Sequence, residues 1–163
     1  MMLRVPLPTR RATRQLAQAL GRQLQVGDLV ILTGELGAGK TFFVRALARS
    51  LGLDTNVRVT SPTFALVQEL ETRPPLAHAD LYRLTGARQL TDTGLEAMRE
   101  QAVLIVEWGA PYAAALGGDA LELKLTPEPR HAELYADGER SHRILKALEQ
   151  GLAPSGAAVS LRD

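Results

Sequence analysis

The stretch that decides the fold of this chain is Leu29–Thr41, with the sequence LVILTGELGAGKT. It begins as an apolar run, continues as a loop with three glycines, and ends in a lysine followed by a threonine. A short apolar run that stops at a glycine is typical of a buried strand. Apolar residues recur at helical spacing from Lys40 to Leu51, so a helix is expected to start where the loop ends.

The loop matches the pattern G-x-x-x-x-G-K-[ST] without a gap, which predicts a phosphate-binding loop. Its glycines let backbone N–H groups turn inward toward phosphate oxygens, and the start of the helix adds a positive end. Lys40 is expected to reach the β- and γ-phosphates, and the Thr41 hydroxyl to bind Mg²⁺. The side chains of Glu35 and Leu36 are expected on the loop surface. The expected nucleotide-binding residues of the loop are Gly34, Glu35, Leu36, Gly37, Ala38, Gly39, Lys40 and Thr41.

A phosphate loop also needs a carboxylate that holds the metal shell, and two candidates follow apolar segments. Glu107 follows AVLIV (102–106), and Asp80 follows PLAHA (75–79). The carboxyl ends of parallel strands meet at one edge of a sheet, so both acids are expected near the loop. We assign Glu107 to the metal and Asp80 to the attacking water or to sensing the γ-phosphate. The reverse assignment, or ordinary surface carboxylates, are the alternatives.

The nucleotide is predicted to be ATP. A GTPase carries an Asn-Lys-x-Asp element for guanine, but the only asparagine here, Asn56, is followed by Val57. Trp108, the only tryptophan, follows Glu107 directly. It is predicted to pack in the core, to form a wall beside the nucleotide, or to contact a partner.

Strand and helix patterns alternate along the chain, which predicts an α/β fold. The fold class is a P-loop NTPase three-layer sandwich, with a mostly parallel central sheet and antiparallel C-terminal strands. One domain is expected over residues 1–150 and a disordered tail over 151–163. The predicted strands are 3–5, 29–33, 76–79, 102–106, 121–125 and 131–136, with extended segments at 56–60 and 63–70; the predicted helices are 9–23, 40–51, 86–100 and 139–150.

Composition limits the other classes of function. The net charge is +1, so no overall basic field attracts nucleic acid. The chain has no cysteine, no apolar run of about 18 residues, and no apolar core of a secretion signal at its start. A cytoplasmic protein with no membrane contact is expected.

Four motifs in this order resemble one family. GELGAGKT, VTSPTF (59–64), HADLYRL (78–84) and IVEW (105–108) are similar to the bacterial TsaE ATPases. The resemblance covers residues 9–150. It implies a P-loop domain without a lid that binds Mg-ATP and hydrolyses it weakly alone. It also implies partner proteins, TsaB and TsaD, of which TsaD transfers a threonylcarbamoyl group to the adenosine next to the anticodon. ATP hydrolysis would support turnover of this complex, and tRNA would be reached through it.

The resemblance also assigns roles to residues. Ser61–Phe64 would be a first switch, with the Thr63 hydroxyl near the γ-phosphate; by its position alone, this segment is equally a plain turn. Asp80 would be the acid of a second switch, and Glu107 with Trp108 the Walker B-like pair. The expected catalytic residues are thus Lys40, Asp80 and Glu107, and the expected metal ligands are Thr41 and Glu107.

Two other functions compete with an ATPase that depends on partners. A small-molecule kinase needs an arginine-rich lid, but residues 86–100 offer only Arg88 and Arg99. A nucleotide-gated binding module, in which ATP orders the switches and hydrolysis is incidental, is the other alternative.

Overall fold

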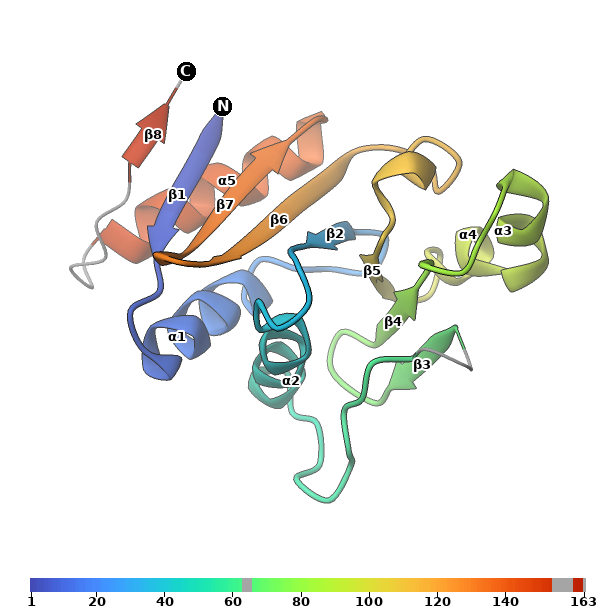
Figure 1. Ribbon diagram of the computed structural model, residues 1–163, viewed down its shortest axis with the longest axis horizontal. Helices are drawn as coiled ribbons and strands as arrows, with labels where there is room; N and C mark the ends of the chain where they lie inside the picture. The colour runs from blue at the N-terminus through green and yellow to red at the C-terminus, as the bar shows by residue number, and fades with distance from the viewer. Residues whose placement is uncertain (63–65, 154–159, 163) are drawn as a thin grey trace.

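The computed structural model describes residues 1–62, 66–153 and 160–162, and their strands form one eight-stranded sheet (Figure 1). The strand order is β3-β4-β5-β2-β6-β7-β1-β8. The strands are β1 (Met2–Pro6), β2 (Leu29–Thr33), β3 (Val67–Leu70), β4 (Leu76–Asp80), β5 (Val103–Glu107), β6 (Ala120–Pro127), β7 (Arg130–Ala136) and β8 (Ser160–Arg162). The helices are α1 (Arg10–Gly21), α2 (Lys40–Ser50), α3 (Ala87–Thr93), α4 (Leu95–Met98), α5 (Glu139–Leu152) and the 3₁₀ turn η1 (Ala110–Tyr112).

The four central strands are parallel, which confirms a mixed α/β fold with a mostly parallel centre. β4 pairs with β5, β5 with β2, and β2 with β6, each in parallel. β6 and β7 pair antiparallel, as predicted for the C-terminal strands. β2 and β5 are buried almost throughout, because strands in the middle of a parallel sheet are covered on both faces.

The apolar core lies on both faces of the sheet. Val30 and Leu32 of β2 pack with residues of α1, α2 and α5, including Leu16, Phe43 and Leu145. Leu29 and Ile31 of the same strand pack in a second cluster with residues of α3 and α4. Alternate residues of a strand point to opposite faces, so β2 contributes to both clusters.

Helices α1 and α2 pack side by side on the first face, where Figure 1 shows them in blue and cyan. A Cβ added at Gly21 would lie 2.9 Å from Ser50 Oγ and 3.3 Å from Leu47 Cδ1. Glycine at this position therefore lets α1 approach α2 closely, and a larger residue would require these side chains to move. The Thr9 side chain caps α1 by accepting a hydrogen bond from the Ala12 N–H at 3.1 Å.

Three segments differ from the sequence prediction. Residues 56–60 form no strand, because the Arg49 side chain holds this loop by donating to the carbonyls of Thr55 and Val57. The predicted helix at 86–100 is divided into α3 and α4 by Gly94, whose φ is 71°. The tail was expected to be disordered from Gly151, but α5 continues to Leu152 and β8 pairs with β1, which offers it an open sheet edge.

Candidate functional site

The loop between β2 and α2 has the backbone geometry that its glycines predict. Gly37 and Gly39 have φ values of 83° and 101°, and a Cβ at either would meet no atom within 4 Å. Glycine is favoured at both positions because the backbone is left-handed there, and not because neighbouring atoms leave no room for a side chain. Gly34 differs, because a Cβ there would lie 2.7 Å from the Leu125 carbonyl oxygen. It lets β6 pass close to the start of the loop.

The loop residues fit a phosphate chain. Gly39 is the N-cap of α2 and makes no side-chain capping bond, so the first N–H groups of this helix have no partner within the helix. Lys40 Nζ donates to the carbonyl of Gly34 and lies 3.5 Å from that of Glu35, so its ammonium spans the loop. The Ala38 N–H is already used in a hydrogen bond to Glu35 O at 3.0 Å. An anion at this helix start would satisfy the remaining donors.

Both candidate carboxylates lie at the ends of neighbouring strands. Asp80 and Glu107 are directly opposite each other in the parallel pairing of β4 with β5. Both are buried, with 7% and 3% of their surface exposed. Asp80 accepts hydrogen bonds from the Ser61 hydroxyl at 3.4 Å and the Tyr82 N–H at 2.9 Å. The sheet therefore brings together two acids that are 27 positions apart in the sequence.

His78 holds one oxygen of Glu107. Its Nε2 lies 2.8 Å from Glu107 Oε2, and its side chain is fully buried. Its Nδ1 has no partner among the described residues. The pairing of His78 with Glu107 was not predicted from the sequence. The spacing of His78 and Asp80 was a usable signal that His78 lies on the same face as the candidate carboxylates, because residues two apart on a strand point to the same face of the sheet.

A pocket of 770 Å³ joins these features. Of the predicted residues, Gly34 and Ala38 do not line it, and Thr63 lies outside the described residues. Phe42, Ser61 and Tyr82 line it in addition to the predicted catalytic and ligand-binding residues. The predicted residues in its wall are Glu35, Leu36, Gly37, Gly39, Lys40, Thr41, Asp80, Glu107 and Trp108.

Two exposed aromatic rings form one rim of this pocket. Trp108 is 54% exposed and Tyr82 is 65% exposed, and their ring centroids lie 5.1 Å apart. Core packing is therefore wrong for Trp108, which lies at the pocket rim. The turn after β5 explains this: Trp108 has a φ of 58°, and a Cβ at Gly109 would lie 2.7 Å from Val106 Cγ1. The chain bends sharply here and turns the indole outward.

A smaller hollow of 170 Å³ lies beside the same loop and shares Gly39 and Phe42 with the main pocket. Leu7, Leu125 and Phe42 give it apolar walls, and Arg10 and Arg130 add charge. It was not predicted, because its walls come from five separate segments of the chain.

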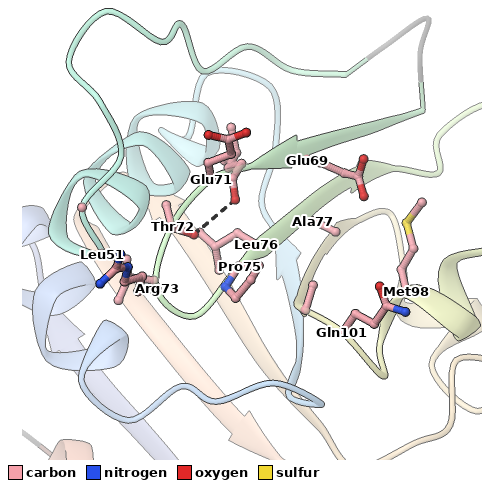
Figure 2. A pocket seen from close by; sticks show the side chains of 13 residues that line it. Leu51, Glu69, Glu71, Thr72, Arg73, Pro75, Leu76, Ala77, Met98 and Gln101 are labelled. Carbon is pink, nitrogen blue, oxygen red and sulfur yellow. Dashed lines mark hydrogen bonds between the residues drawn. The ribbon is translucent and has the colours of Figure 1, made fainter.

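A pocket of larger volume, 860 Å³, lies elsewhere (Figure 2). It is lined by Leu76 at the start of β4 and Ala102 just before β5, whereas the candidate site lies at the ends of these strands. Thr72 Oγ1 in its wall donates to the Pro74 carbonyl at 2.8 Å. No predicted site residue lines it, so volume alone does not identify the functional site.

The described residues contain no group of three or more His, Asp or Glu side chains that could hold a metal alone. A magnesium ion here would have to combine Thr41 and Glu107 with water or ligand oxygens, which is how this ion is usually bound. No described helix is long and apolar enough to cross a membrane.

Comparisons with known proteins agree on one family. The family described as "Threonylcarbamoyl adenosine biosynthesis protein TsaE" matches residues 7–134. A tRNA threonylcarbamoyladenosine biosynthesis protein TsaE of Streptomyces coelicolor is 39% identical over 138 residues, covering 78% of this chain and 92% of the relative. One of Treponema pallidum is 36% identical, covering 78% and 89%. The crystal structure of Bacillus subtilis YdiB aligns with a TM-score of 0.69 and 25% identity, covering 92% of this chain and 95% of that one.

Proposed function

The chain belongs to the TsaE family of threonylcarbamoyl adenosine biosynthesis proteins, and on this premise we propose that it is a P-loop ATPase of the machinery that makes threonylcarbamoyladenosine in tRNA. The fold would be the three-layer P-loop sandwich. The single observation that carries the proposal is the 770 Å³ pocket, in which the loop meets two buried carboxylates. ATP and Mg²⁺ are the proposed ligands.

The loop and the start of α2 would hold the triphosphate. Backbone N–H groups would bind its oxygens. The Lys40 ammonium would leave the carbonyl oxygens of Gly34 and Glu35 and bind the β- and γ-phosphates instead. Bound Mg²⁺ would neutralise charge on the phosphates and orient them. Thr41 and Glu107 are the proposed ligands. Among the described residues, His78 alone bonds to the Glu107 carboxylate, through Oε2, which leaves Oε1 for the metal shell.

Asp80 would act on the nucleophilic water. Its carboxylate is buried and held by Ser61 and the Tyr82 N–H, so it is fixed in orientation. A carboxylate held in this way accepts a proton or a hydrogen bond from water in a defined direction. The contact with Ser61 also links Asp80 to the segment that we propose as the first switch.

The nucleoside would occupy the smaller hollow. The γ-phosphate end of the ligand is directed toward Asp80 and Glu107, so the other end must leave the loop elsewhere. The hollow beside Gly39 offers apolar walls from Leu7 and Phe42. Flat apolar walls suit a base, and Arg10 and Arg130 suit the polar sugar and α-phosphate.

The site lacks one component of a fast ATPase. Lys40 is the only cation among the described residues that line the 770 Å³ pocket. Charge that develops on the γ-phosphate usually needs a second cation, often supplied by a partner. We therefore propose weak hydrolysis by the chain alone and stimulation by TsaB and TsaD, with tRNA modified by the complex.

A kinase function has less support. Leu90 of α3 and Leu95 of α4 are buried in the second core cluster, so this segment is packed against the sheet. It offers no hinged lid, which a small-molecule kinase would need to close over its acceptor.

The test is phosphate release from Mg-ATP by the full chain, with and without the cognate TsaB and TsaD. Lys40→Ala is the blank, because it removes the cation of the pocket. We expect slow release alone and at least about tenfold stimulation by the pair. Fast release that the pair leaves unchanged would contradict partner dependence. Release that Lys40→Ala does not reduce would contradict the assignment of the loop.

A further inference from the structure

The positive charge of the chain is concentrated on two adjacent helices. The charged residues of α1 and α2 are Arg10, Arg11, Arg14, Lys40, Arg45 and Arg49, and neither helix contains Asp or Glu. Together the two helices carry +6, whereas the whole chain carries +1, so the remaining residues carry −5. A nearly neutral total therefore conceals a strongly basic surface.

A groove of 470 Å³ runs over this surface between the two helices. Arg14 lines it from α1, and Arg45 and Arg49 line it from α2. Arg14 and Arg45 are exposed. Phe42 lines this groove and both hollows beside the glycine loop, but Arg14 and Arg45 line neither hollow, so the groove adjoins the candidate site and presents cations of its own.

Its arginines have no acidic counterpart in the part of the chain that the structure describes. The salt bridges there involve Arg140 and Arg143 of α5 and two histidines, and none involves α1 or α2. Arg49 donates to the carbonyls of Thr55 and Val57, which fixes its position but leaves its charge uncompensated. The groove thus presents cations that an external anion could pair with.

Phe42 adds an aromatic ring among these cations. It lines the groove, and the guanidinium carbon of Arg14 lies 5.8 Å from its ring centroid. A guanidinium that stacks on a ring keeps its N–H groups free at the edge, where they bind phosphate in pairs. The Phe42 ring is half-buried, and the Arg10 guanidinium carbon also lies 5.8 Å from its centroid, so the exposed part of the ring offers a stacking surface for an unpaired base between arginines.

We propose that this arginine groove, formed by Arg14, Arg45 and Arg49 around Phe42, binds the sugar–phosphate backbone of RNA. Arginine forks and an aromatic surface fit phosphates and bases better than they fit the separated carboxylates of an acidic protein. The choice of RNA also rests on the proposed function, which places the chain in tRNA modification. The chain would then contact tRNA directly, and not only through its partners.

The test is the binding of a labelled, unmodified tRNA transcript to the full chain, followed by fluorescence anisotropy over a series of salt concentrations. The test variant is Arg14→Gln with Arg45→Gln. The matched control is Arg88→Gln with Arg143→Gln, which removes the same charge from the exposed surfaces of α3 and α5. Thermal melting checks that both variants fold as the wild type does.

We expect the wild type to bind tRNA at low salt, with an affinity that falls as salt rises. The groove variant should bind at least about tenfold more weakly, and its log–log salt slope should be smaller by about 2, because two phosphate contacts are lost. The control should bind within about twofold of wild type. If the groove variant has a lower melting temperature than the wild type, the single variant Arg45→Glu takes its place and should weaken tRNA binding by a similar factor.

Three results would overturn the proposal. The first is no binding of tRNA by the wild type at any salt concentration. The second is a loss of affinity in the control equal to that in the groove variant. The third is competition by poly-L-glutamate of equal charge as strong as that by tRNA, which would indicate an acidic protein as the occupant. Lys40→Ala separates this question from the ATPase. If it loses ATP binding but keeps tRNA binding, the two sites are independent, and failure of either leaves the other standing.

Discussion

At the scale of single residues, Asp80 and Glu107 differ in their surroundings although they occupy equivalent positions on neighbouring strands. Asp80 has hydrogen-bond donors on both oxygens, from Ser61 and the Tyr82 N–H. Glu107 has His78 on one oxygen only. A carboxylate with an uncommitted oxygen is the better candidate for a metal shell, and one that is fixed on both sides is better suited to orienting a water molecule.

These differences predict distinct effects of two conservative variants. Glu107→Gln should raise the magnesium concentration needed for half-maximal ATP binding by at least about tenfold, since the loss of even an outer-shell partner of a metal site costs this much metal affinity. Asp80→Asn should keep the ATP affinity within about twofold of the wild-type value. It should lower the rate of phosphate release by about a hundredfold, which is a usual contribution of a general base. Magnesium titrations of nucleotide binding and single-turnover release measure the two. The opposite pattern would mean that the roles are reversed.

His78 is predicted to act by positioning Glu107. His78→Ala leaves a buried carboxylate without its partner, so the magnesium requirement should rise and the melting temperature should fall. His78→Gln keeps a hydrogen-bond donor on a side chain of similar length and should recover part of the magnesium affinity. If the two variants need equal magnesium, His78 has only a packing role.

At the scale of elements, α5 begins with an acceptor borrowed from another segment. Its N-cap is Gly138, which has no side chain, and the Asp119 carboxylate accepts from the N–H groups of Arg140 and Ser141 at 2.8 Å each. A Cβ at Gly138 would lie 2.3 Å from Asp119 Cγ, so glycine is needed to admit the carboxylate. Burial tends to raise the pKa of Asp119, but the hydrogen bonds from Ser141 and Arg140 outweigh it, and the pKa lies below its ordinary value of 3.8.

Asp119→Ala should therefore lower the free energy of unfolding at pH 7 by about 1–2 kcal/mol, the usual value of a lost cap. The folded-state pKa is depressed, so this stabilisation is present above the unfolded value and is lost as pH falls through the folded pKa. The difference between wild type and variant should thus shrink below about pH 4. Urea unfolding at several pH values measures it, and a difference that is constant down to pH 3 would contradict the charged cap.

At the scale of the whole molecule, one ion pair ties the C-terminal helix to the turn before the central strand. Arg140 of α5 donates from Nε to Asp28 Oδ1 at 2.9 Å and from Nη2 to Asp28 Oδ2 at 2.8 Å. Arg140 also donates to the Gln23 carbonyl at 2.6 Å. The hydrogen bonds to Asp28 raise the pKa of Arg140, despite partial burial. Residues 112 positions apart are thus joined next to β2, which leads into the phosphate loop.

Arg140→Ala should destabilise the fold by about 3 kcal/mol, because it leaves the buried Asp28 carboxylate without its cation. The matched control is Arg143→Ala on the same helix, whose pair with Glu139 is exposed and 3.9 Å long, so it should cost less than about 0.5 kcal/mol. Thermal and urea unfolding of both variants tests this. Equal losses would show that the Arg140 pair contributes no more than a surface contact.

The sequence by itself determined the position of the glycine loop, the strand before it, the helix after it and the α/β class. These features depend on contiguous residues: the loop acts through consecutive backbone groups between Gly34 and Thr41, and a central strand such as β5 is apolar along its whole length. It also determined that Asp80 and Glu107 end strands, although not what surrounds them. Local periodicity is sufficient for such features because the interacting groups are close in the chain.

Only the tertiary structure decided the pairing of His78 with Glu107, the contact of the exposed Trp108 ring with Tyr82, the cap that Asp119 provides for α5, and the joining of the arginines of α1 and α2 into one groove. Each depends on two segments that are remote in the sequence and meet through the strand order β4-β5-β2-β6 or through the packing of α1 on α2. The physical reason is that burial and hydrogen bonding act between neighbours in space, and a sequence pattern reports only neighbours along the chain.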